Sequence, residues 1–169
     1  MSSTSAGDGV SGSEDLKYAE NLVEKAWGHI ERARDELKRC PPSCSNVIEL
    51  CQTAIELCGK AIYKLMGVEF PREHQLLFEK RGEVAQQFKK LLSKEFPSFF
   101  PYRDEIPRVV FLSYFWYRFG VIAKYGIEEV GIPPDKLFTR REAELAVEHA
   151  EECLRVAQSL LALKRIEEK

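Results

Sequence analysis

One arginine lies within the most apolar stretch of the sequence, and its chemistry is the first that needs explaining. Arg118 is the one charged residue of VVFLSYFWYRFGVIA, residues 109–123, which is otherwise apolar, aromatic or small. A buried charge is costly unless it is paired. Arg118 is therefore expected to pair with a carboxylate, face a wet cleft or bind an anion. Two interpretations stay open: a structural pair with Glu56 or another carboxylate, and an anion or phosphate site.

Further polar and aromatic candidates lie on the same helix and on one earlier in the chain. Tyr125 follows the arginine by seven residues, so both lie on one helix face, and Lys124 directly precedes that tyrosine. Glu56 and Lys60 are four residues apart, the spacing of a salt bridge on a solvated helix face. Tyr114 opens an aromatic run that could stack on bases, although such residues on a central helix more often form core or dimer interface.

The cysteines and histidines do not form a metal-binding pattern. Three cysteines recur every seven residues, which places their sulfur atoms ~10 Å apart, whereas structural zinc sites use short spacings such as CxxC. Core packing explains these cysteines better, and the histidines are scattered without a second ligand at metal spacing. We therefore expect neither a metal nor a cofactor. The residues concerned are Cys44, Cys51, Cys58, His29, His74 and His149.

Hydrophobic periodicity predicts five helices that would position these residues. Apolar residues recur at helical spacing, and no segment alternates with period two over a useful length. Gly67 is expected to end the second helix in a left-handed conformation, and Thr139 with Glu142 has the capping-box pattern at the start of the fifth. The order of the helices predicts an all-α, up-and-down bundle. The predicted helices cover residues 16–39, 45–66, 74–95, 104–125 and 139–165.

Single positions within these helices carry further expectations. Trp27 falls on the apolar, buried side of the first helix, and Gly82 falls inside the third. The fourth helix is apolar nearly all round, which is typical of a central helix or of a helix in an oligomer interface.

Length and composition limit the class of protein. The chain of 169 residues is long enough for one domain, which we place at residues 14–169 after a Ser/Gly-rich, disordered tail over residues 1–13. The net charge of −2 provides no general attraction for nucleic acid, so any such contact must be a local patch. No apolar run is long enough to span a membrane, and no signal-peptide pattern opens the chain, so we expect a cytoplasmic protein without membrane contact.

Three segments of the chain, taken in order, are similar to one known family. They are CQTAIELCGKAIYKLMGVEFPREHQL (residues 51–76), WYRFGVIAKYG (116–126) and PPDKLFTRREAELAVEHAEECL (133–154). Together they resemble the HEPN family, the higher eukaryotes and prokaryotes nucleotide-binding domain. The likeness spans nearly everything from residue 16 onward, and its order and spacing are more specific than any segment alone.

The resemblance implies a helical bundle that forms a homodimer, with the signature arginine helices lining a cleft. It places Arg118 at the signature position and the face of Glu56 and Lys60 beside that cleft. Active members are metal-independent ribonucleases that carry Arg-x4-6-His, and many are toxins paired with a nucleotidyltransferase antitoxin. In this chain the histidine is missing, because positions 123 to 125 are alanine, Lys124 and Tyr125.

The missing histidine lowers the expectation of catalysis. Metal-free RNA cleavage needs a base that titrates near neutral pH, and histidine is the natural choice. An ordinary phenol titrates near ~10, and a lysine base would need strong desolvation. The expected function is therefore a non-catalytic module that binds nucleotide, RNA or a protein partner. Two alternatives stay open, a diverged ribonuclease toxin using Arg118 and Tyr125, and a structural interaction subunit.

Overall fold

Five α-helices make up most of the part of the chain that the structure describes. The computed structural model describes residues 8–71, 82–97 and 99–169, with side chains from residue 12 onward. Short 3₁₀ turns lie at Arg103–Glu105, Glu128–Val130 and Pro134–Lys136. The α-helices are α1 (Asp8–Leu37), α2 (Cys44–Leu65), α3 (Glu83–Leu92), α4 (Ile106–Tyr125) and α5 (Arg140–Glu167).

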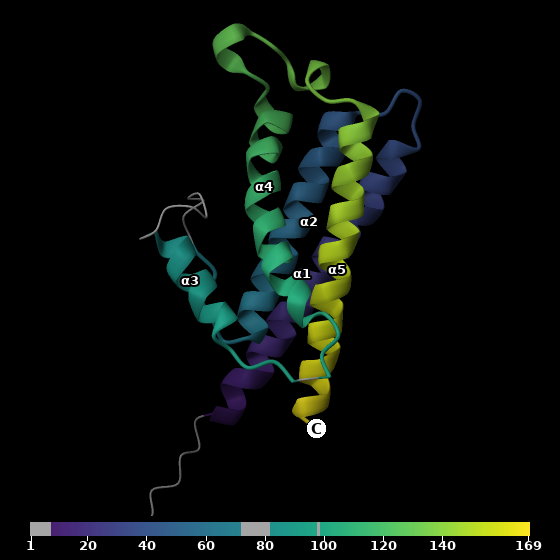
Figure 1. Cartoon of the computed structure of the whole chain (residues 1–169). Helices are drawn as coiled ribbons and strands as arrows, with labels where there is room; N and C mark the ends of the chain where they lie inside the picture. The colour runs from purple at the N-terminus through teal and green to yellow at the C-terminus, as the bar shows by residue number, and fades with distance from the viewer. Residues whose placement is uncertain (1–7, 72–81, 98) are drawn as a thin grey trace, which may run out of the picture.

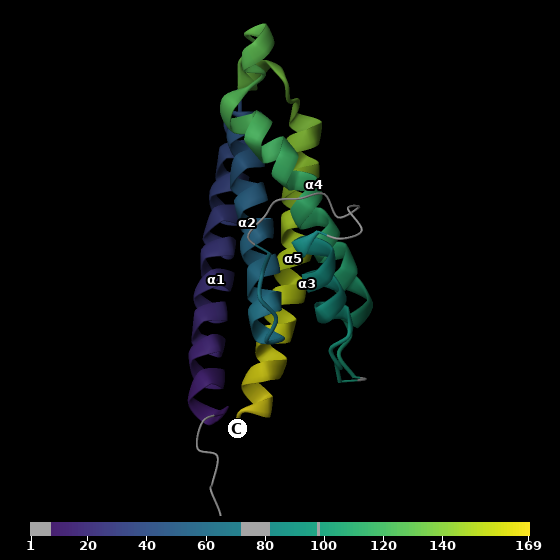
Figure 2. The ribbon, with the colours of Figure 1, turned by 90° about the vertical axis from the view of Figure 1, so that its left-hand side faces the viewer.

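Four long helices lie side by side with alternating chain direction, and the shorter α3 lies outside them (Figures 1 and 2). Helix α2 contacts α1, α4 and α5, so it occupies the centre of the bundle. The predicted all-α bundle is confirmed. No described helix is both long and apolar enough to cross a membrane.

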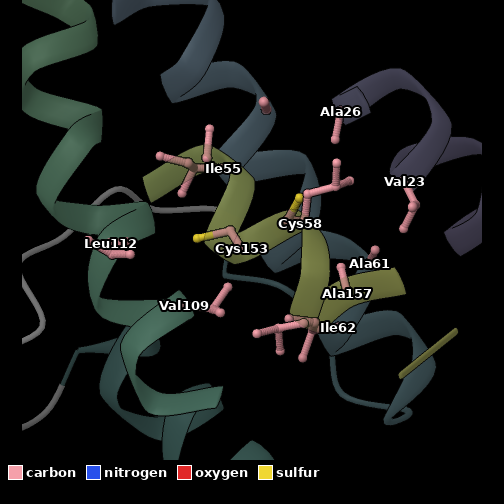
Figure 3. Close-up of a cluster of buried hydrophobic side chains, with 14 of the residues drawn as sticks. Val23, Ala26, Ile55, Cys58, Ala61, Ile62, Val109, Leu112, Cys153 and Ala157 are labelled. Carbon is pink, nitrogen blue, oxygen red and sulfur yellow. The ribbon is translucent and has the colours of Figure 1, made fainter. Parts of the chain in front are cut away.

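The core is filled by small and branched apolar side chains from the four long helices. Ala26 of α1, Ile55 and Cys58 of α2, Leu112 of α4 and Cys153 of α5 lie in one cluster (Figure 3). Cys51, Cys58 and Cys153 are fully buried, whereas Cys40 is exposed and Cys44 is half-buried. Packing in the core is therefore the role of Cys51 and Cys58, as their spacing along α2 predicted.

Two glycines let α2 and α4 approach closely. A Cβ atom added at Gly120 of α4 would lie 2.6 Å from Cγ of Gln52 on α2. A Cβ atom added at Gly59 of α2 would lie 2.9 Å from Oγ of Ser113 on α4. A side chain at either position would force the facing side chain, Gln52 or Ser113, to shift, because such separations are well inside van der Waals contact.

Local signals set several helix ends as predicted. Thr139 Oγ1 accepts a hydrogen bond from the Arg141 amide, and Glu142 accepts one from the Thr139 amide, which forms the capping box of α5. Gly67 follows α2 with a φ of 64°, in the left-handed region that glycine adopts without strain. The cap of α2 was not predicted: the Ser43 hydroxyl oxygen accepts from the Asn46 amide.

Other expectations were wrong in detail. Helix α1 begins at Asp8, earlier than the predicted start at residue 16, and it ends at Leu37; residues 1–7 of the predicted tail lie outside the described residues. Trp27 is 52% exposed, because it lies at the edge of the apolar side of α1. Gly82 is the extended N-cap of α3 and not an interior residue, and α3 ends at Leu92; residues 74–81 lie outside the described ranges.

Candidate functional site

Arg118 is exposed on the outward face of α4 and is not buried as its sequence surroundings suggested. Trp116 and Gly120, two positions on either side, are buried against the bundle. Residues two positions apart in a helix point to nearly opposite sides, so Arg118 points into solvent. Helix α4 therefore buries one face only, and it covers the bundle without being its centre.

The guanidinium of Arg118 has no hydrogen bond or ion pair with any described residue. The structural pair with Glu56 does not form, because Glu56 accepts from Gln52 Nε2 at 3.0 Å and pairs with Lys60 Nζ at 2.7 Å. Of the two interpretations open for Arg118, the pair with Glu56 is excluded.

The residues around Arg118 on this face are apolar. Phe111, Phe115, Val121 and Tyr125 are between 38% and 58% exposed. The rings of Phe111 and Phe115 stack with their centroids 5.9 Å apart. We call this surface, formed by Phe111, Phe115, Arg118, Val121 and Tyr125, the outward face of α4.

Tyr125 and Lys124 lie at the end of that helix, as their positions in the sequence predicted. Lys124 Nζ lies 5.3 Å from the centroid of the Tyr125 ring, within the range of a cation–π contact. Both side chains are exposed. Lys124 therefore lacks the desolvation that a lysine base would need.

Tyr114 lies four residues before Arg118, on the same side of α4, but its side chain is half-buried there. Its hydroxyl is buried and has no hydrogen-bond partner among the described residues. Burial, followed by the neighbouring carboxylates of Glu83 and Glu56, raises the pKa of Tyr114 well above its ordinary value. Tyr114 is half-buried and packs against the core, so it does not offer an open ring for base stacking.

Glu56 and Lys60 line a pocket of about 740 Å³ beside the end of α2, and Arg118 does not line it. Asp15 and Tyr18 of α1 form one wall, and Phe70 lies on the segment that follows α2. The predicted site residues thus divide between this pocket and the outward face of α4. Sequence reasoning missed Asp15, Tyr18 and Phe70, but Lys64, four residues after Lys60, was a signal for the same face.

The described histidines both use Nδ1 as a hydrogen-bond acceptor. Arg32 Nη2 lies 2.9 Å from His29 Nδ1, and Trp116 Nε1 lies 3.0 Å from His149 Nδ1. Burial lowers the pKa of both rings, aided by Arg32 at His29 and by Arg108 at His149. His74 lies outside the described residues. Within the described ranges, no group of three or more His, Cys, Asp or Glu side chains is placed so that it could hold a metal ion.

Comparison with known proteins gives one match. The family model described as HEPN domain matches residues 19–163, which includes all of α2 and α4 but not Asp15 and Tyr18 of α1. No curated protein and no solved structure matches the chain.

Proposed function

The chain belongs to the HEPN domain family, and we propose that it is a non-catalytic member that dimerises through the outward face of α4 and binds RNA or nucleotide phosphate with Arg118. The observation that carries this proposal is an exposed arginine without an ion pair among the described residues, at the centre of an apolar helix face. Guanidinium groups suit phosphate oxygens because their donors form a planar fork.

The apolar neighbours of Arg118 support a second copy of the chain as the first occupant of this face. Phe111 and Phe115 expose large rings to solvent, and Val121 continues the exposed apolar surface along the helix. Contiguous apolar surface of this kind marks interaction sites, and twofold dimers are the commonest soluble oligomers. In a twofold contact centred on this face, the two Arg118 side chains would approach each other. Their repulsion would be relieved by a bound phosphate.

The histidine geometry supports binding over cleavage. Indole nitrogen only donates, so the bond from Trp116 requires neutral His149 with its proton on Nε2. Nδ1 of His149 is thus occupied, and Nε2 is already protonated. Trp116 lies on the buried side of α4, so His149 is also on the opposite side of that helix from Arg118.

Three measurements on the full chain test the proposal. Light scattering is expected to give a dimer, and filter binding with a labelled single-stranded RNA is expected to show retention that Arg118→Ala abolishes. Incubation with the same RNA is expected to leave it intact. A strict monomer, or RNA binding equal in the wild type and Arg118→Ala, would overturn the proposal. RNA cleavage that Arg118→Ala abolishes would instead establish the diverged ribonuclease.

A further inference from the structure

A second exposed apolar surface lies where α3 ends and the chain turns toward α4. Leu92, the last residue of α3, is 48% exposed, and Phe99 in the loop that follows is 74% exposed. Helix α3 lies outside the four long helices, so its end is open to solvent (Figure 1). A single exposed apolar side chain needs no explanation, whereas large ones exposed near one another mark interaction sites. The end of α3 is therefore a candidate interaction surface.

The loop after α3 is anchored by the neighbours of Phe99 and not by Phe99 itself. Phe100 is 4% exposed, and its ring stacks on that of Phe96 with the centroids 5.9 Å apart. Tyr102 meets the Phe100 ring edge-on at 6.1 Å. The Phe100 amide also donates a hydrogen bond to the Pro97 carbonyl at 2.9 Å. Because these contacts fix Phe100 in the core, the ring of Phe99 is held outside it.

Three lysines at the end of α3 carry charges that the fold does not neutralise. Lys89 and Lys90 lie in the last turn of α3, and Lys94 follows its C-cap. All three are exposed, and none has an ion pair with a described residue. Glu95 is the one carboxylate in the sequence from residue 89 to residue 99, so positive charge exceeds negative charge there. Lys89 precedes Leu92 by three residues, which makes their side chains neighbours on the helix surface.

The kind of apolar side chain favours lipid over nucleic acid as the anionic partner. Single-stranded RNA binds where successive bases stack on exposed rings. Phe99 offers such a ring, but Phe96 and Phe100 stack on each other, and Leu92 has no ring. A membrane surface with anionic lipid suits every part: phenylalanine and leucine enter the boundary between headgroups and acyl chains, and lysines stay among the headgroups. We propose that the end of α3 and Phe99 bind the surface of a membrane that contains anionic lipid.

This contact is peripheral, because no described helix is long and apolar enough to cross a membrane. It departs from the expectation of a protein without membrane contact, which considered only membrane spans and signal peptides. None of its residues belongs to the outward face of α4, so it is independent of the proposed role of Arg118. We call it the lipid surface; its residues are Lys89, Lys90, Leu92, Lys94 and Phe99.

Sedimentation of the full chain with lipid vesicles tests this inference. Vesicles of phosphatidylcholine with phosphatidylserine are expected to carry the protein into the pellet, whereas vesicles of phosphatidylcholine alone are expected to leave it in solution. High salt is expected to release the protein, because it screens the attraction between the lysines and the headgroups. Absence from the pellet with phosphatidylserine, or equal sedimentation with both kinds of vesicle, would overturn the proposal.

Two triple variants separate the lipid surface from the charge of the whole chain. Replacement of its three lysines by glutamine is expected to weaken vesicle binding about fivefold for each lysine. The matched control makes the same replacement at Lys17, Lys25 and Lys136, which are exposed and have no ion pair with a described residue. It removes the same charge and is expected to weaken binding far less. Equal losses in the two triple variants would refute the lipid surface.

A change at Phe99 tests the apolar part of the contact. Phe99→Ser is expected to weaken vesicle binding at least about tenfold. Val130→Ser, at a residue that is 65% exposed in the 3₁₀ turn after α4, is expected to leave binding unchanged. Circular dichroism checks that each variant is folded. Vesicle binding that Phe99→Ser leaves intact, or loss of RNA retention in the lysine triple variant of a protein that does not bind vesicles, would overturn the proposal, and the second result would assign the surface to RNA.

Discussion

Trp116 donates its indole N–H to Nδ1 of His149 across 3.0 Å, and this bond joins α4 to α5. Trp116 is 3% exposed, and the centroids of the two rings are 5.9 Å apart in an edge-on arrangement. The bond requires a neutral imidazole, because protonation of Nδ1 would set two donors against each other. Beside this contact, Arg108 Nε and Nη2 donate to the two carboxylate oxygens of Glu152.

Acidification is expected to destabilise the fold through this histidine. Burial, followed by Arg108, lowers the pKa of His149 below its ordinary value, while Glu152 and Glu148 oppose the shift. As the pH falls, the unfolded chain therefore binds a proton at this histidine before the folded chain does. The contribution of His149 to the free energy of unfolding is fully present above about pH 6.5, decreases below it, and levels off below the pKa of the folded state. Urea unfolding at about pH 7.5 and about pH 5.5 measures the change.

The control for that prediction must remove the contribution of His29, the second histidine whose pKa is lowered. The pKa of His29 is also lowered, so it contributes with the same sign. In a His29→Gln background, the further change His149→Gln is expected to reduce the difference in stability between the two pH values. An unchanged difference would show that His149 does not carry the effect.

Removal of the exposed arginine is expected to leave stability unchanged while it abolishes ligand binding. Arg118 has no ion pair among the described residues, so Arg118→Ala should alter the free energy of unfolding by less than about 0.5 kcal/mol. Retention of RNA in filter binding should be lost, while the dimer in light scattering should persist. Arg155→Ala, at an exposed arginine of α5, is the matched control and should retain RNA. Equal loss in both variants would indicate a general effect of charge.

A charge placed beside Arg118 is expected to separate the proposed dimer. Val121 is 44% exposed on the outward face of α4, and Val121→Lys would place a second cation in the contact without a partner. The dissociation constant should rise at least about tenfold, as measured by analytical ultracentrifugation. Ile166→Lys, at a residue of α5 that is 72% exposed, should leave the dimer intact. A dimer that tolerates Val121→Lys would use another surface.

The close approach of α2 and α4 makes a variant of Gly120 informative. Gly120→Ala is expected to destabilise the fold by about 1–3 kcal/mol, because the new Cβ would lie 2.6 Å from Cγ of Gln52. In a Gln52→Ala background the same change should cost less, because Cγ and Oε1 of residue 52 are removed while its Cβ stays 3.0 Å from the new Cβ. Gly28→Ala on α1 is the control, with no atom within 4 Å of the new Cβ, and should stabilise. Equal effects of Gly120→Ala in both backgrounds would exclude Gln52 as the cause.

Helix ends with local signals were predictable, and those without them were not. Thr139 and Glu142 carry the whole capping box within four residues, so the start of α5 could be found from sequence. Helix α1 begins at Asp8, in a stretch rich in glycine and serine. Such a stretch has weak helix propensity, so no local pattern predicted this helix start. Gly82 is the N-cap of α3 because its backbone is extended. A glycine in the sequence does not by itself show whether it lies inside a helix or at its start.

The outward face of α4 could not be found from periodicity. The exposed Phe111, Phe115 and Val121 are as apolar as the buried Leu112 and Trp116. The hydrophobic pattern of the sequence therefore does not show which side of α4 faces solvent. The exposure of Arg118 therefore depends on how α4 lies against α2 and α5, which is a property of the whole fold. The contact of Trp116 with His149 spans 33 residues of sequence and has no motif.

The central position of α2 also has a consequence for how the molecule opens. Helix α2 contacts each of the other three long helices, whereas α3 lies outside them and buries Val84 and Leu91. Amide hydrogens of α2 should exchange with deuterium only when the whole chain unfolds, because no smaller opening exposes them to solvent. Those of α3 should exchange far sooner, while the bundle beneath them stays intact.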